Sequence, residues 1–174
     1  MKKFLVVVDM QKDFVDGALG TKEAVAIVDN VVKKIENFDG EIFVTLYTHF
    51  DNYLETNEGK SLPVTHCVFG SDGWKLNEKV DSALKNKSFM SIEKPTFGSV
   101  KLPELIKKAA DGEDFSIELI GLCTDICVVS NALLLKAYFP EALIWVDSRC
   151  CAGVTPENHL AALKTMASCQ IKVI

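Results

Sequence analysis

Short apolar runs alternate with helical patterns along the whole chain. Residues 4–8 (FLVVV) form a continuous apolar run, which is typical of a strand buried on both faces of a sheet. Residues 22–38 then place apolar side chains three and four positions apart, which predicts an amphipathic helix. These positions are Ala24, Ile27, Val28, Val31, Ile35 and Phe38.

The same alternation continues to residue 174. Further strands are predicted over 41–47, 89–92, 117–120, 142–146 and 171–174. Helices are predicted between them over 75–85, 103–110, 125–138 and 156–168. Such alternation implies parallel strands joined by right-handed crossovers. We therefore expect one domain over residues 1–174, with an α/β fold: a three-layer α/β/α sandwich around a parallel sheet of about six strands.

Composition supports a globular domain and narrows its partners. The chain is 48% apolar and 25% charged, as expected of a protein that buries a core. Its 19 Lys and Arg against 24 Asp and Glu give a net charge of −5, which argues against a nucleic-acid partner or an acidic membrane. No apolar run reaches the length of a membrane span, and the N-terminal apolar run ends at Asp9. We expect a cytoplasmic protein whose six cysteines are reduced.

Reactive side chains follow several of the predicted strands. In parallel α/β sheets the site lies beyond the carboxyl ends of the strands. Asp9, Lys94 and Cys127 all lie at or shortly after such ends. No glycine-rich phosphate-binding motif follows the first strand, and no P-loop motif occurs, so no nucleotide cofactor is expected.

Cys127 is the candidate nucleophile. It lies in the first turn of the predicted helix 125–138, which Thr124 or Asp125 can cap. The unpaired N–H groups of a first turn lower the pKa of a thiol, although a buried structural cysteine is the alternative interpretation. For Asp9 the alternative roles are a cap, a metal ligand or a general base. For Lys94 they are a solvated surface lysine or a group that stabilises negative charge. Together these groups form a plausible catalytic triad.

Three segments in order carry a family resemblance. VVVDMQKDF, IEKPTFGS and GLCTDICV resemble the isochorismatase-like cysteine hydrolases, the superfamily that includes nicotinamidases. The closing VDSRCCAGVTPENHLAALKTM is similar to that family as well. The resemblance implies the catalytic triad Asp9, Lys94 and Cys127, a cis peptide bond before Cys123, and an oxyanion hole made by the backbone N–H groups of Cys123 and Cys127. It also implies that Phe14 flanks the substrate.

The resemblance extends to a metal site, with one departure. His49 and His66 match two metal-binding histidines of nicotinamidases, whereas Tyr47 stands at the expected carboxylate position. Asp51 is a possible replacement, because residues 47, 49 and 51 share a face in an extended segment. Such a set would suit zinc, iron or manganese, and the alternative is two polar pocket residues without metal.

The long connection over residues 50–74 shows little clear secondary structure, and connections of that length are usually functional or mobile. Its Tyr53, Leu54, Phe69 and Trp74 either wall a pocket for a flat ring or pack the loop onto the domain.

The function that these features favour is cleavage of the C–N amide bond of a small molecule through a thioester, with nicotinamide as the leading substrate. The alternatives are hydrolysis of another small amide, ureide or vinyl ether, or a catalytically silent binding protein on the same fold. We also expect a homo-oligomer.

Overall fold

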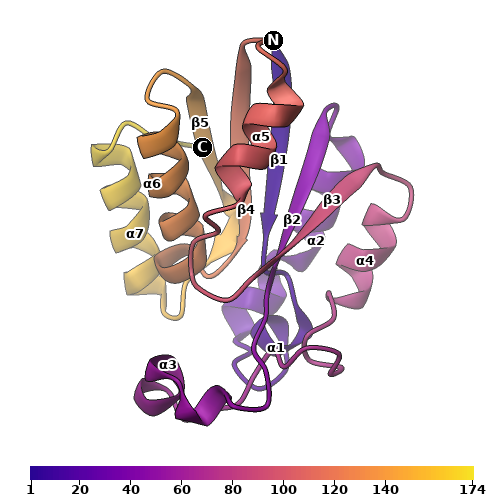
Figure 1. The fold of residues 1–174 in the computed structure, drawn as a ribbon, viewed down its shortest axis with the longest axis vertical. Coiled ribbons are helices and arrows are strands. Elements are labelled where there is room, and N and C mark those ends of the chain that lie inside the picture. The colour runs from indigo at the N-terminus through magenta and orange to yellow at the C-terminus, as the bar shows by residue number, and fades with distance from the viewer.

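A six-stranded parallel sheet forms the centre of the computed structural model, which describes residues 1–174 (Figure 1). The strand order is β3-β2-β1-β4-β5-β6, and every neighbouring pair is parallel. The strands are β1 (Lys2–Val8), β2 (Glu41–Tyr47), β3 (Phe89–Lys94), β4 (Phe115–Leu122), β5 (Leu143–Ala152) and β6 (Lys172–Val173). The predicted α/β fold with about six parallel strands is confirmed.

Helices cover both faces of the sheet. One face carries α2 and α4, and the other carries α5, α6 and α7 (Figure 1). The helices are α1 (Lys12–Val15), α2 (Lys22–Asn37), α3 (Asn57–Ser61), α4 (Glu78–Leu84), α5 (Leu102–Ala110), α6 (Val129–Tyr138) and α7 (Pro156–Ser168). Two short turns complete the set, η1 (Tyr53–Glu55) and the π-helical η2 (Thr124–Val128). None of the helices combines the length and apolar character needed to cross a membrane.

The continuous apolar run of β1 explains its central place. Leu5 and Val7 point into the core beneath α2, while Phe4, Val6 and Val8 point into the core beneath α5 and α6. Strands buried on both faces lack the alternation of half-exposed strands. The adjacent α2 is capped by Thr21, whose side chain accepts a hydrogen bond from the backbone N–H of Ala24 at 3.0 Å.

Two elements differ from the sequence expectation. The connection over 50–74 contains η1 and α3, because Thr56 caps α3 by accepting a hydrogen bond from the backbone N–H of Gly59 at 3.0 Å. Strand β5 runs to Ala152, beyond the predicted end at residue 146, because its register against β4 shifts at an irregularity after Leu119 and the pairing resumes.

A glycine lets β4 approach β1 at the carboxyl edge of the sheet. Gly121 has φ +117°, and a Cβ there would lie 2.1 Å from the carbonyl oxygen of Val8. Only glycine accommodates that approach. The next residue after Val8 is Asp9, which itself adopts the left-handed φ of 47°. The chain therefore turns sharply where the sheet presents its reactive groups.

Candidate active site

Asp9 and Lys94 form a buried ion pair at the carboxyl edge of the sheet. Lys94 Nζ lies 2.6 Å from Asp9 Oδ2, and the two side chains are 1% and 0% exposed. Thr45 donates its hydroxyl to Asp9 Oδ1 at 2.7 Å, and Lys94 Nζ donates to the carbonyl of Thr96 at 3.0 Å. Asp9 Oδ2 faces the ammonium and accepts no other hydrogen bond. This oxygen can therefore accept a proton.

The Cys127 thiol lies close enough to both charges to respond to them. It is 4% exposed, and burial raises its pKa well above the ordinary value. The Asp9 carboxylate raises the pKa further, while the Lys94 ammonium opposes the rise. The expectation of a lowered thiol pKa is therefore wrong, because burial outweighs the turn. Burial and the neighbouring Asp9 therefore favour the protonated thiol over the thiolate.

Neither predicted cap of the helix that carries Cys127 is made. The turn η2 begins after Cys123 with no side-chain cap. The Thr124 hydroxyl pairs with His159 Nδ1 at 2.8 Å, and Asp125 accepts from the backbone N–H of Val154 at 3.0 Å. Both side chains therefore fasten the turn to the segment around α7. The peptide bond before Cys123 is cis, as the resemblance implied.

Asn131 joins the two segments that carry Lys94 and Cys127. This fully buried side chain accepts from the backbone N–H of Ser99 at 2.9 Å. It donates to the carbonyls of Cys127 at 2.8 Å and Phe97 at 3.2 Å. Sequence reasoning missed this residue, because an asparagine within a helix has no signature of such a bridge.

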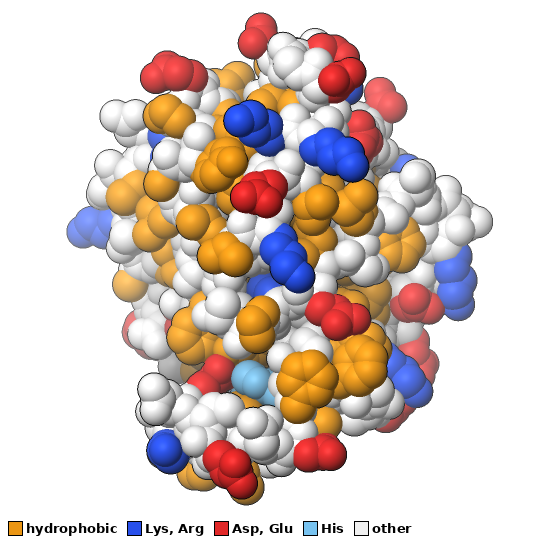
Figure 2. All heavy atoms as spheres, viewed as in Figure 1, with side chains coloured by type: hydrophobic (Ala, Val, Ile, Leu, Met, Phe, Trp, Pro, Cys, Tyr) orange, Lys and Arg blue, Asp and Glu red, His pale blue; other side chains and the backbone are white.

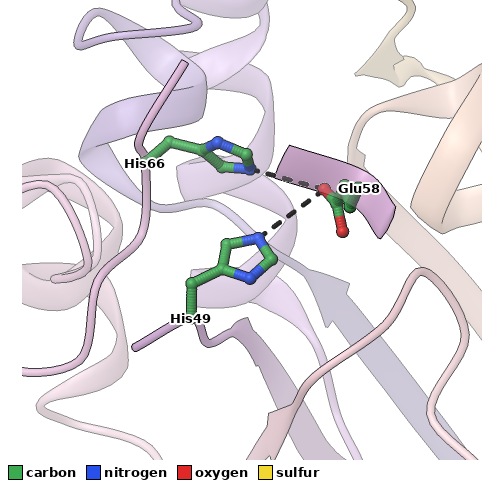
Figure 3. A group of neighbouring side chains, drawn as sticks. All are labelled: His49, Glu58 and His66. Carbon is green, nitrogen blue, oxygen red and sulfur yellow. Dashed lines mark ion pairs between the residues drawn. The ribbon is translucent and has the colours of Figure 1, made fainter. Parts of the chain in front are cut away.

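Three side chains near the triad make a possible metal site. His49, Glu58 and His66 each offer one ligand atom, and these atoms lie within 4.8 Å of one another. Both imidazoles point toward one carboxylate oxygen (Figure 3): Glu58 Oε1 lies 3.6 Å from His49 Nε2 and 3.7 Å from His66 Nε2. Figure 2 shows a histidine side chain in a recess low on one face, bordered by hydrophobic side chains.

The hydrogen bonding of these residues suits a cation. His66 Nδ1 lies 2.7 Å from the carbonyl of Val64, which fixes the proton on Nδ1 and leaves Nε2 with a lone pair. His49 Nε2 is buried without a hydrogen-bond partner. Two ligands of one tetrahedral zinc lie about 3.4 Å apart. The distances from Glu58 Oε1 to the two histidine nitrogens, 3.6 Å and 3.7 Å, are close to that spacing. Two histidines and a carboxylate, with a fourth position open, therefore fit a divalent metal.

Glu58 takes the place that the sequence interpretation gave to Asp51. Asp51 is exposed and is not part of the group, because the chain turns after Phe50 instead of staying extended. Burial alone raises the pKa of Glu58, but His49 and the hydrogen-bonded Tyr47 lower it, and the net pKa lies below its ordinary value. Burial lowers the pKa of His66. The group therefore combines an ionised carboxylate with a neutral imidazole.

Aromatic rings separate the ion pair from the histidines. Tyr47 is 1% exposed and lies 4.2 Å below Lys94 Nζ, measured to the ring centroid. Phe14 stacks on Tyr47 at 6.0 Å between centroids and meets His66 edge-on at 5.5 Å. Phe14, which the resemblance expects to flank the substrate, therefore lies against Tyr47 and His66.

The loop aromatics mainly pack the loop. Tyr53 is buried and donates its hydroxyl to the carbonyl of Leu62 at 2.7 Å, and Trp74 donates to the hydroxyl of Thr48 at 3.0 Å. Phe69 packs on Trp74 but stays half exposed, and Leu54 is exposed. Of the two interpretations, packing onto the domain accounts for Tyr53 and Trp74.

These features coincide with a known family. Residues 3–174 match the family model described as the Isochorismatase domain, and the chain belongs to that family. It is a hydrolase of the isochorismatase-like α/β fold, close in structure to nicotinamidases.

Three solved structures give the extent of the similarity. The nicotinamidase/pyrazinamidase PncA from Bacillus subtilis is 25% identical, with 99% of each chain covered and a TM-score of 0.85. N-carbamoylsarcosine amidase from Thermoplasma acidophilum is 26% identical, covering 99% of this chain and 95% of that chain at a TM-score of 0.76. The pyrazinamidase of Pyrococcus horikoshii in complex with zinc is 24% identical, with 100% and 99% covered and a TM-score of 0.81, a likeness of fold.

Proposed function

We propose that this hydrolase cleaves the C–N bond of a small amide through a thioester on Cys127, with nicotinamide as the leading substrate. The observation that carries the proposal is the buried Asp9–Lys94 ion pair beside the Cys127 thiol. An ammonium and a carboxylate held away from water act strongly on a neighbouring group that changes its charge. The similarity to nicotinamidases supports the choice of substrate.

Asp9 acts first as the general base. Its Oδ2 accepts the thiol proton, and the sulfur attacks the amide carbon as the carbonyl electrons move onto oxygen. The backbone N–H groups of Cys123 and Cys127 stabilise that oxyanion. The N–H of Cys123 is free for this task, since it donates to no other group of the protein. Lys94 stabilises the negative charge that develops beside it.

The intermediate then collapses to a thioester. The C–N bond breaks as Asp9 returns its proton to the leaving nitrogen, which departs as ammonia. Asp9, again a carboxylate, takes a proton from water, and the resulting hydroxide attacks the thioester carbon. The C–S bond breaks, the carboxylic acid leaves, and the sulfur regains the proton. Each turnover consumes one water and restores the thiol.

His49, Glu58 and His66 would hold a divalent cation near the ring of the substrate. When bound, such a cation supplies a Lewis-acidic position that can orient a pyridine nitrogen. Zinc, iron and manganese all suit two histidines and a carboxylate, and the Pyrococcus horikoshii pyrazinamidase was solved in complex with zinc. Phe14, which meets His66 edge-on, is the apolar side chain that we propose to flank a flat substrate ring.

A second candidate substrate is a small ureide or another amide. Two observations favour it. Tyr47 stands at the position where the resemblance to nicotinamidases leads us to expect a metal-binding carboxylate, and the fold matches an N-carbamoylsarcosine amidase. A vinyl ether, as in isochorismatase itself, is the third substrate class that the family model leaves open. All three classes use the same carboxyl edge of the sheet.

Ammonia release from a panel of amides and ureides separates these candidates. We expect nicotinamide to give the highest kcat/KM. Cys127→Ala should abolish turnover, whereas Cys151→Ala, the same change at an equally buried thiol, should retain it. Asp9→Asn should lose about 10²–10⁴-fold in rate, because an amide cannot accept the thiol proton. Wild-type turnover by Cys127→Ala would refute the nucleophile, and faster ureide or vinyl ether cleavage would refute the substrate.

A further inference from the structure

Tyr47 connects the ion pair to the histidine cluster, and the proposed mechanism does not use it. It is the last residue of β2 and stands two residues before His49. Its ring is held on several sides, with centroid distances of 4.6 Å to His49, 6.0 Å to Phe14 and 6.0 Å to Phe97. The Lys94 ammonium lies over its face. A ring so enclosed presents its hydroxyl in one direction.

That hydroxyl donates a hydrogen bond to Glu58 Oε2. The other oxygen of the carboxylate, Oε1, is the one that faces His49 and His66. The two oxygens of Glu58 therefore have separate partners: one is engaged by the phenol and one is directed at the histidines. A glutamate side chain has several rotatable bonds, so such a partner restricts which oxygen the histidines meet.

The backbone of Glu58 is fixed independently of Tyr47. It lies in the short α3, which Thr56 caps. A Cβ on the neighbouring Gly59 would lie 2.1 Å from the carbonyl of Tyr53, so α3 sits directly against η1. The loop backbone thus places Glu58 beside the two histidines, and only the side chain of Glu58 keeps conformational freedom.

We propose that Tyr47 is a positioning residue that orients Glu58 as the carboxylate ligand of a divalent cation. A carboxylate from α3, held by a phenol on β2, thereby serves where the family resemblance expects a carboxylate on β2 itself. This inference rests on the metal site of the proposed function and makes no use of the amide substrate. Groups that hold a metal ligand in place commonly change metal affinity by about 10- to 100-fold when removed.

The test is the dissociation constant of zinc and of manganese, measured by competition with a chromophoric chelator on the metal-stripped protein. Tyr47→Phe keeps the ring and removes only the donor, so we expect affinity to fall roughly 10- to 100-fold. Tyr53→Phe is the matched control. That ring also packs on His49, at 4.4 Å, but its hydroxyl binds the carbonyl of Leu62. The control should bind metal as the wild type does.

A double variant separates positioning from general damage. Glu58→Ala should weaken metal binding, and adding Tyr47→Phe to it should change the affinity by less than about twofold, since the phenol then has no side chain to orient. The inference is overturned if Tyr47→Phe binds metal as tightly as wild type, if its loss persists in the Glu58→Ala background, or if the wild type binds neither metal. Because chelator competition needs no substrate, a failure of nicotinamide hydrolysis leaves this result readable.

Discussion

The ion pair beneath the proposed nucleophile makes a sharp prediction about stability. Lys94 Nζ and Asp9 Oδ2 lie 2.6 Å apart, and the side chains are 1% and 0% exposed. At an effective dielectric constant of about 20, two unit charges at that separation attract by about 6 kcal/mol. Removing both ions from water costs several kcal/mol each. The intact pair therefore contributes little net stability.

Removal of one partner is a different case. Lys94→Met is close in volume but leaves the Asp9 carboxylate buried, with only the Thr45 hydroxyl as a hydrogen-bond donor from a side chain. Breaking a buried pair in this way costs about 3–5 kcal/mol. For a domain of this size that corresponds to a fall in Tm of roughly 6–20 °C.

Urea unfolding followed by circular dichroism at pH 7 measures the loss. The control is the double variant Lys94→Met with Asp9→Asn, which removes the orphaned charge and should recover much of the stability. A loss below about 1 kcal/mol for Lys94→Met would place the pair among exposed salt bridges and refute the reasoning. So would a double variant less stable than the single one.

Three further predictions follow from named contacts. Burial lowers the pKa of Lys94, but the larger combined effect of Asp9 and Cys127 raises that pKa above 10.5. The charged ammonium therefore contributes its full stabilisation below pH 10.5, and this stabilisation is lost as pH rises through the folded-state pKa. Urea midpoints against pH should show that alkaline decline in the wild type and less of it in Lys94→Met; equal declines would contradict it. Asn131→Leu removes the side-chain partner of the Ser99 N–H and of two carbonyls, and should cost at least about 2 kcal/mol and lower kcat. Unchanged unfolding and turnover would show that the bridge is dispensable. Thr21→Ala should destabilise α2 by about 1 kcal/mol without changing kcat, and a Thr21→Ser variant should stay close to wild type in the same unfolding assay.

Much of the fold was predictable because each element carries a local signal. Continuous apolar runs such as residues 4–8 fit only strands covered on both faces, and period-3.6 patterns such as residues 22–38 place one helical face on them. Parallel strands then send their carboxyl ends to one edge. The strand-end positions of Asp9 and Lys94 therefore predict that they lie at one edge, where their side chains are 2.6 Å apart.

Glu58 shows where such reasoning ends. It lies in a connection without periodicity, among Asp51 and Glu55, and nothing local distinguishes these three carboxylates. The choice depends on how Thr56 and Gly59 pack α3 against η1. An extended chain would have placed Asp51 as the third metal ligand, but the chain turns after Phe50 and leaves Asp51 outside the cluster. Contacts between distant segments, not spacing, select the third side chain of the cluster.

Periodicity and local motifs were sufficient to predict the parallel sheet, its helices, the family resemblance and the strand-end residues Asp9, Lys94 and Cys127. Three properties could be seen only in the folded chain: the direction of the thiol pKa shift, the partner of each histidine and the bridge at Asn131. Those properties depend on burial and on distances between segments far apart in sequence. A first-turn cysteine is expected to be acidic, yet complete burial beside a carboxylate raises its pKa, since desolvation outweighs the field of a single turn.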